Sequence, residues 1–161
     1  MGSSKILTLS NLKKVLAKLR KEEKKIVTTN GVFDILHPGH ITLLEKAKKL
    51  GYVLIVLVNS DKSVKKIKGK NRPINNEVDR AKLISALECV NYVSIFNEDD
   101  PRKILNIIKP NIHVKARDYR IDQIIEKEIV EKNGGKLVLL PFKKGYSTSS
   151  IIKKITKVYR K

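Results

Sequence analysis

The 161-residue chain has little sulfur and few aromatic rings: one cysteine (Cys89), one methionine, no tryptophan, and 5% Phe, Trp and Tyr together. A single cysteine excludes an internal disulfide and is typical of a reducing compartment. The chain also lacks an apolar run of the roughly 20 residues that a membrane-spanning helix needs, and its start lacks a secretory signal. We therefore expect a cytoplasmic protein with no membrane segment.

Acidic residues are scarce as well, with 16 Asp and Glu against 35 Lys and Arg, a formal net charge of +19. Such an excess raises the possibility of nucleic-acid binding. The lysines are dispersed over many segments, however, and few aromatic side chains accompany them for base stacking. Small polyanionic substrates are therefore the favoured partners, and nucleic acid is the less favoured alternative.

Short apolar runs alternate with amphipathic segments along the whole chain. The runs predict strands at 25–29, 52–58, 92–96, 112–115 and 136–140. Helices are predicted from Ser10, from His37, from Asn75 or Asn76, after Asp100-Pro101, from about Ile121, and from Ser147, the last with Ile151, Ile152 and Ile155 facing inward. This alternation predicts an α/β protein: a Rossmann-like three-layer fold with a five-stranded, mostly parallel sheet.

We expect a single domain over 1–161, with residues 1–4 resembling a vector-derived remnant and a core at about 25–156. Polar residues follow several of the predicted strands: His37 and His40, Asn59 and Asp61, Lys115 and Asp118, Ser147 and Thr148. In parallel sheets, ligands bind at the carboxyl ends of the strands. These separate segments are therefore expected to converge on one site.

The stretch His37-Pro38-Gly39-His40 follows a strand and a glycine turn and opens a helix. Free N–H groups and the helix dipole at such a terminus favour anions, and two imidazoles there can donate to phosphate oxygens. Histidines three residues apart could instead bind a metal, but such a site wants a third ligand nearby. The remaining histidine, His113, falls in a predicted strand and is expected to be structural. Phosphate binding is the favoured interpretation.

Four other positions carry weaker signals. Asp34 is interpreted either as a ligand of the Mg²⁺ that accompanies a triphosphate or as a residue that orders its loop. Lys68, in a basic loop predicted over 65–72, is a candidate phosphate clamp, although the loop matches no Walker motif. Tyr146 to Ser149 could cap the last helix and bind phosphate, and Arg80 is expected to be structural.

Several motifs carry a family resemblance: Gly-Val-Phe-Asp-Ile-Leu-His-Pro-Gly-His at 31–40, Val-Asn-Ser-Asp at 58–61, Lys-Gly-x-x-Arg-Pro-Ile-Asn at 68–75, Asp-Arg-Ala at 79–81, Ala-Leu-Glu-Cys-Val at 86–90, Phe-Asn-Glu-Asp-Asp-Pro at 96–101 and Ser-Thr-Ser at 147–149. With them the chain resembles the cytidylyltransferase-like nucleotidyltransferase superfamily from about Ile26 to Ile155. Within it, the chain is most similar to the heptose-1-phosphate adenylyltransferases of ADP-heptose and lipopolysaccharide precursor synthesis.

This resemblance implies transfer of AMP from ATP to a sugar 1-phosphate, expected to be D-glycero-D-manno-heptose 1-phosphate, with Mg²⁺ and release of pyrophosphate. Some relatives fuse this domain to a kinase, and these 161 residues contain no kinase segment, so the resemblance implies a stand-alone module. It also implies a homodimer. We assign His37, His40 and Lys68 to catalysis and Asn59, Asp61 and Arg72 to the sugar phosphate. The residues assigned to the nucleotide are Gly31, Val32, Phe33, Asp34, Gly39, Lys115, Asp118, Tyr146, Ser147, Thr148 and Ser149, with Asp34 also the candidate Mg²⁺ ligand.

Two departures from the family pattern leave alternatives open. Ala116-Arg117 replaces a Gly-Gly pair after the fourth strand, and Lys144 stands where an acidic residue is common. The alternatives are a cytidylyltransferase for glycerol 3-phosphate or ethanolamine phosphate, an FAD-synthetase-like adenylyltransferase, a catalytically silent nucleotide binder, and a basic nucleic-acid-binding module.

Overall fold

The computed structural model describes residues 4–116, 124–141 and 145–159. Its centre is a five-stranded sheet in the order β3-β2-β1-β4-β5, in which every neighbouring pair is parallel. The strands are β1 Ile26–Gly31, β2 Val53–Asn59, β3 Tyr92–Phe96, β4 Ile112–Ala116 and β5 Lys136–Leu140. The sequence prediction of five strands in a parallel α/β fold is thereby confirmed.

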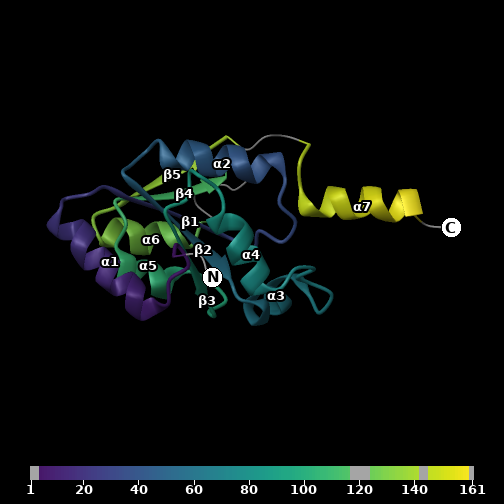
Figure 1. Ribbon diagram of the computed structural model, residues 1–161, viewed down its shortest axis with the longest axis horizontal. Helices are drawn as coiled ribbons and strands as arrows, with labels where there is room; N and C mark the ends of the chain where they lie inside the picture. Colours follow the sequence, from purple (N-terminus) through teal and green to yellow (C-terminus); the bar gives the residue numbers. More distant parts are fainter. Residues whose placement is uncertain (1–3, 117–123, 142–144, 160–161) are drawn as a thin grey trace.

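Helices cover both faces of the sheet, as Figure 1 shows. They are α1 Leu9–Lys21, α2 Pro38–Lys48, α3 Asp61–Lys68, α4 Glu77–Ser85, α5 Arg102–Ile108, α6 Glu126–Lys132 and α7 Thr148–Tyr159. Apolar side chains of α2 and α4 pack on one face, and those of α1, α5 and α6 pack on the other. The result is the expected three-layer arrangement. No helix in the described ranges is long and apolar enough to cross a membrane.

The interior strand β2 is buried along its whole length, as its continuous apolar run predicts for a strand covered on both faces. Its alternate residues enter different cores, with Val56 on the α2 and α4 side and Ile55 on the α1 and α5 side. Because successive side chains of a strand point to opposite faces, the same alternation decides which polar residue at each strand end reaches which side of the site.

Two local predictions at helices α1 and α3 are wrong. Thr8, not Ser10, caps α1, since the Thr8 side chain accepts the backbone N–H of Asn11. The first half of the basic loop predicted over 65–72 is helical, because Ser60 caps α3 and Val64 provides a buried anchor. The three lysines in the last turn of α3 suit the negative end of the helix dipole.

The inward packing predicted for the last helix is also wrong. Helix α7 extends away from the body of the domain (Figure 1), and none of its residues is buried. Ile155 is 50% exposed, and Val158 and Tyr159 are more exposed still. An apolar stripe indicates that a helix has a buried face in its assembly, but it does not specify which surface covers it.

Candidate active site

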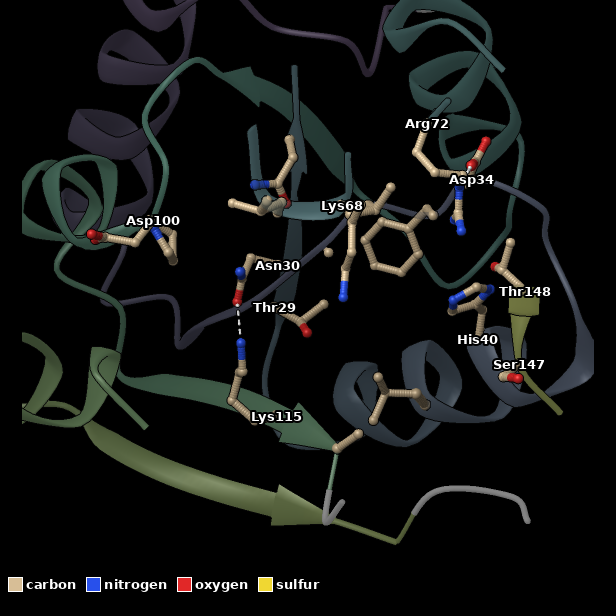
Figure 2. Close-up of a pocket in the computed structure, with 18 of the residues that line it drawn as sticks. Thr29, Asn30, Asp34, His40, Lys68, Arg72, Asp100, Lys115, Ser147 and Thr148 are labelled. Atoms are coloured by element: carbon tan, nitrogen blue, oxygen red, sulfur yellow. Dashed lines mark hydrogen bonds and ion pairs between the residues drawn. The ribbon is translucent and has the colours of Figure 1, made fainter. Parts of the chain in front are cut away.

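A cavity of about 460 Å³ lies at the carboxyl ends of the strands, where β1, β2 and β4 meet the starts of α2, α6 and α7. Figure 2 shows ten of its residues labelled. The predicted site residues that line it are Gly31, Val32, Phe33, Asp34, His37, His40, Asn59, Lys68, Arg72, Lys115, Ser147, Thr148 and Ser149. Gly39, Asp61 and Tyr146 do not line it, and Asp118, Arg117 and Lys144 lie outside the described residues.

His37 is the N-cap of α2, and its side chain also lines the cavity. Its Nδ1 accepts the backbone N–H of His40 at 3.4 Å. A neutral imidazole that accepts at Nδ1 carries its proton on Nε2. The Nδ1 of His37 thus holds the helix terminus in place, and the ring also lines the cavity.

The two imidazoles stack, with ring centroids 3.7 Å apart and planes at 17°. The ring of Phe33 packs edge-on against His40 at 5.2 Å. Burial, with a smaller contribution from the neighbouring His37, lowers the pKa of His40 to about 4, and burial lowers the pKa of His37. Both rings are therefore neutral hydrogen-bond donors at neutral pH, which suits phosphate binding without a fixed positive charge.

Asp34 orders the loop that carries Arg72. Its carboxylate accepts from Arg72 Nε at 2.6 Å and from the backbone N–H groups of Ile74 and Asn75 at 2.9 Å each. Burial alone would raise the pKa of Asp34, but the bonds from Asn75, Ile74 and Arg72 outweigh it and lower the pKa. These contacts favour the loop-ordering interpretation over Mg²⁺ binding, because the carboxylate oxygens already have donors.

Asp61 pairs with Arg80, away from the cavity wall. Arg80 is fully buried and donates to Asp61 Oδ1 at 2.7 Å, to the carbonyl of Val32 at 2.6 Å and to that of Asn75 at 2.9 Å. The structural role predicted for Arg80 is supported, although its partner lies on α3 and not in its own helix. These contacts do not support the assignment of Asp61 to the sugar phosphate, since its carboxylate holds a buried guanidinium.

The last turn of α3 and the start of α7 place further donors around the histidines. Lys68 is exposed and points into the centre of the cavity (Figure 2). Ser147 accepts the backbone N–H of Ser150 at 3.0 Å and so caps α7, as predicted. Tyr146 stacks on His37 at 6.4 Å and so supports the ring from outside the cavity. Lys68, Ser147 and Thr148, together with His37 and His40, form what we call the phosphate end of the cavity.

Sequence reasoning missed the opposite end, lined by Asn30, Asp99, Asp100 and Glu126. Glu126 is 4% exposed and accepts from Lys115 Nζ at 2.8 Å, and Lys115 also donates to Asn30 Oδ1 at 3.1 Å. An acidic residue in the first turn of a helix is ordinarily exposed to solvent, where it interacts favourably with the helix dipole. Nothing in the sequence therefore indicates that Glu126 is buried.

The described residues hold no group of three or more His, Cys, Asp or Glu side chains placed to bind a metal ion.

A parallel sheet with helices on both faces and a polar cavity at the carboxyl ends of its strands defines a doubly wound α/β domain. The chain belongs to the Cytidylyltransferase-like family, whose model matches residues 28–154.

Among curated relatives, the chain is 44% identical over 158 residues to the bifunctional protein HldE of Citrifermentans bemidjiense, covering 98% of this chain and 32% of that protein. It is 47% identical over 148 residues to the bifunctional protein HldE of Helicobacter pylori strain J99, covering 92% of this chain and 31% of the relative. The chain thus spans about a third of the length of these relatives.

Similar solved structures include the following two. The lipopolysaccharide core biosynthesis protein from Thermoplasma volcanium GSS1 has a TM-score of 0.63 at 35% identity, covering 77% of this chain and 99% of that one. Pantoate-beta-alanine ligase from Francisella tularensis, complexed with beta-gamma ATP and beta-alanine, has a TM-score of 0.65 at 20% identity, covering 96% and 77%. The second likeness shows the fold alone.

Proposed function

We propose that this domain is an adenylyltransferase that transfers AMP from ATP to a sugar 1-phosphate, with D-glycero-D-manno-heptose 1-phosphate as the expected acceptor. The observation that carries the proposal is the phosphate end of the cavity. Two stacked neutral imidazoles there face Lys68 and the hydroxyl-rich start of α7. Identities of 44% and 47% to bifunctional HldE proteins over most of this chain support the choice of acceptor.

The chemistry is an in-line displacement. A phosphate oxygen of the sugar 1-phosphate forms a bond to the α-phosphorus of ATP, and the bond from that phosphorus to the bridging oxygen of the β-phosphate breaks. The electron pair leaves with pyrophosphate. A phosphate dianion needs no general base, so the protein supplies position and charge stabilisation.

Each phosphate-end residue has a defined task in this reaction. His37 and His40 donate N–H bonds to the transferring and leaving phosphates, Lys68 adds the mobile positive charge, and the α7 terminus binds pyrophosphate oxygens. Asp34 keeps Arg72 at the cavity wall, where its side chain is only 19% exposed. Loss of one such donor from a preorganised site typically slows turnover about 10²–10³-fold.

Mg²⁺ is proposed to arrive with the triphosphate, where it would neutralise phosphate charge. Asp34 does not fit as its ligand, because Arg72 and two backbone N–H groups occupy the carboxylate. The metal would therefore be held mainly by the phosphates and water, as is common for Mg²⁺-nucleotide complexes.

The test is pyrophosphate release measured with each of ATP, CTP, GTP and UTP against heptose 1-phosphate, glycerol 3-phosphate, ethanolamine phosphate and FMN. We expect release with ATP and heptose 1-phosphate. Release with CTP and glycerol 3-phosphate or ethanolamine phosphate would replace the proposal with the cytidylyltransferase alternative. Release with ATP and FMN would indicate an FAD-synthetase-like enzyme.

We further propose a cytoplasmic homodimer. The exposed apolar residues Ile155, Val158 and Tyr159 on α7 support self-association, since a lone helix seldom leaves such a face in water. Light scattering after size exclusion would give twice the 18.3 kDa chain mass. A monomer at micromolar concentration would contradict the dimer.

A further inference from the structure

The end of the cavity opposite the histidines is built from hydrogen-bond acceptors. We define this acceptor end by Asn30, Asn59, Asp100 and Glu126, all of which line the cavity. Figure 2 shows Asp100, Asn30 and Lys115 on one side of the view and His40, Ser147 and Thr148 on the other. The two ends thus differ in chemistry: N–H and O–H donors for phosphate on one side, carboxylate and amide groups on the other.

Strand register creates this end. Asn59 follows Ile55 and Leu57 on the face of β2 that packs against α1 and α5, and Asn30 follows Ile26 on the same face of β1. In β4, His113 lies opposite Thr28, which places Lys115 beside Asn30 at the next step. The side chains of Asn59, Asn30 and Lys115 therefore lie on one face of the sheet near the carboxyl ends of three neighbouring strands, and Glu126 contacts Lys115 from α6.

Hydrogen bonds or ion pairs hold three polar groups of the acceptor end in place; Asn59 and Glu126 are buried, and Asp100 is half-buried. Asn59 is 4% exposed and donates to Ser63 Oγ at 3.0 Å, and Glu126 is 4% exposed against Lys115. Asp100 accepts from Arg102 Nε and from a terminal guanidinium nitrogen at 2.9 Å each, and the Arg102 side chain holds the pKa of Asp100 below its usual range. Each carboxylate is thus paired with a cation, so it can accept hydrogen bonds from hydroxyl groups without strongly repelling a phosphorylated substrate.

The geometry of an in-line displacement at the α-phosphorus determines which substrate lies at the acceptor end. The attacking and leaving oxygens lie on opposite sides of the phosphorus. If pyrophosphate leaves toward the histidines and the α7 terminus, the acceptor must approach from the opposite side, which is the acceptor end. We infer that Asn30, Asn59, Asp100 and Glu126 bind the hydroxyl groups of the acceptor sugar and so set specificity for a polyhydroxylated phosphate. This inference rests on the proposed function.

The test uses isosteric variants of two residues, Glu126→Gln and Asp100→Asn, with Glu128→Gln as the matched control, since Glu128 is exposed on the same helix and does not line the cavity. Turnover is followed by pyrophosphate release while ATP and heptose 1-phosphate are varied separately. We expect both test variants to raise KM for heptose 1-phosphate at least tenfold, with KM for ATP within twofold of wild type and the control unchanged.

A second arm distinguishes the sugar hydroxyls from those of the ATP ribose. A deoxygenated sugar 1-phosphate should lose most of its rate with wild type and little more with the variants, whereas 2′-deoxy-ATP should affect all proteins equally. A rise in KM for ATP instead, or unchanged KM values in both variants, would overturn the inference. Glu126→Gln removes the charge partner of Lys115, and the variant can misfold for that reason. Asp100→Asn then keeps the test valid, because the Asp100 side chain is 27% exposed.

Wild-type enzyme separates this inference from the proposal beneath it. If wild type turns over heptose 1-phosphate and the variants match it, only the acceptor end is wrong. If wild type turns over no sugar 1-phosphate, the proposed function fails and takes this inference with it.

Discussion

The backbone N–H of His40 donates to Nδ1 of His37, so one imidazole both caps helix α2 and lines the cavity. Capping and phosphate donation can be separated by substitution. Asparagine is a good N-cap but has no group that reaches as far as Nε2, whereas alanine supplies neither function.

We therefore expect His37→Asn to keep the free energy of unfolding within about 0.5 kcal/mol of wild type, and His37→Ala to lose about 1 kcal/mol. Both variants should lose about 10²–10³-fold in turnover. Urea unfolding together with pyrophosphate release measures the two effects. An active His37→Asn variant would contradict the assigned role of Nε2.

The positive charge of Lys68 can be removed without affecting folding, because the side chain is exposed at the end of α3. Lys68→Gln should leave the melting temperature unchanged and lower kcat/KM about 10–100-fold, since a charged hydrogen bond to phosphate is lost. Lys70→Gln is the matched control, as Lys70 is exposed nearby but does not line the cavity. Equal effects of the two substitutions would indicate general electrostatic attraction, not a specific clamp.

Asp61 is predicted to matter for stability and not for substrate affinity. Asp61→Asn leaves the fully buried Arg80 without its charge partner, at an expected cost of about 2 kcal/mol. This is less than the ~3–5 kcal/mol of a fully buried pair, because the Asp61 side chain keeps 30% exposure. Unfolding should show the loss while KM for the sugar phosphate stays constant. A raised KM at unchanged stability would restore Asp61 to the substrate site.

Two histidines with lowered pKa values, His40 and His113, should make the protein less stable as pH falls. Burial, with a smaller contribution from Lys115, lowers the pKa of His113 to about 3, and that of His40 is about 4, whereas an unfolded histidine titrates near 6.5. Below about pH 6.5 the unfolded chain binds protons that the native state does not, so stability is complete above this pH and declines below it.

The expected loss of stability between pH 6 and pH 5 is about 1.2 kcal/mol for each of these histidines. His113 Nδ1 lies 2.8 Å from Thr28 Oγ1, so His113→Gln can retain a polar contact while removing one titrating group. Urea unfolding at several pH values should give a shallower slope for this variant. A wild-type stability that stays flat from pH 7.5 to pH 5 would exclude the effect.

The sequence predicts the strands and the start of helix α2 with its two histidines, because each of these signals is local. Apolar runs give β2 and β3, and the cap and imidazoles of α2 fall within four consecutive residues. The acceptor end depends on register instead. The contact of Lys115 with Asn30 joins residues 85 positions apart, and nothing near Glu126 in the chain indicates that it is buried.

Two errors have the same kind of origin. The charge run before Gly69 resembles a solvated loop in the sequence. Helix α3 nevertheless forms there, because it needs only the Ser60 cap and a few buried contacts. The apolar stripe of α7 is real, but its partner surface is not encoded in the stripe, so the inward direction predicted for Ile151, Ile152 and Ile155 is wrong.

The most direct test of the central claim follows the phosphorus atoms of ATP. With heptose 1-phosphate as acceptor, label from α-³²P-ATP should appear in a nucleotide sugar and label from γ-³²P-ATP in pyrophosphate, with His40→Ala reducing both about 10²–10³-fold. Transfer of the γ-label to the sugar, or release of the α-label only as AMP, would contradict nucleotidyl transfer at this site.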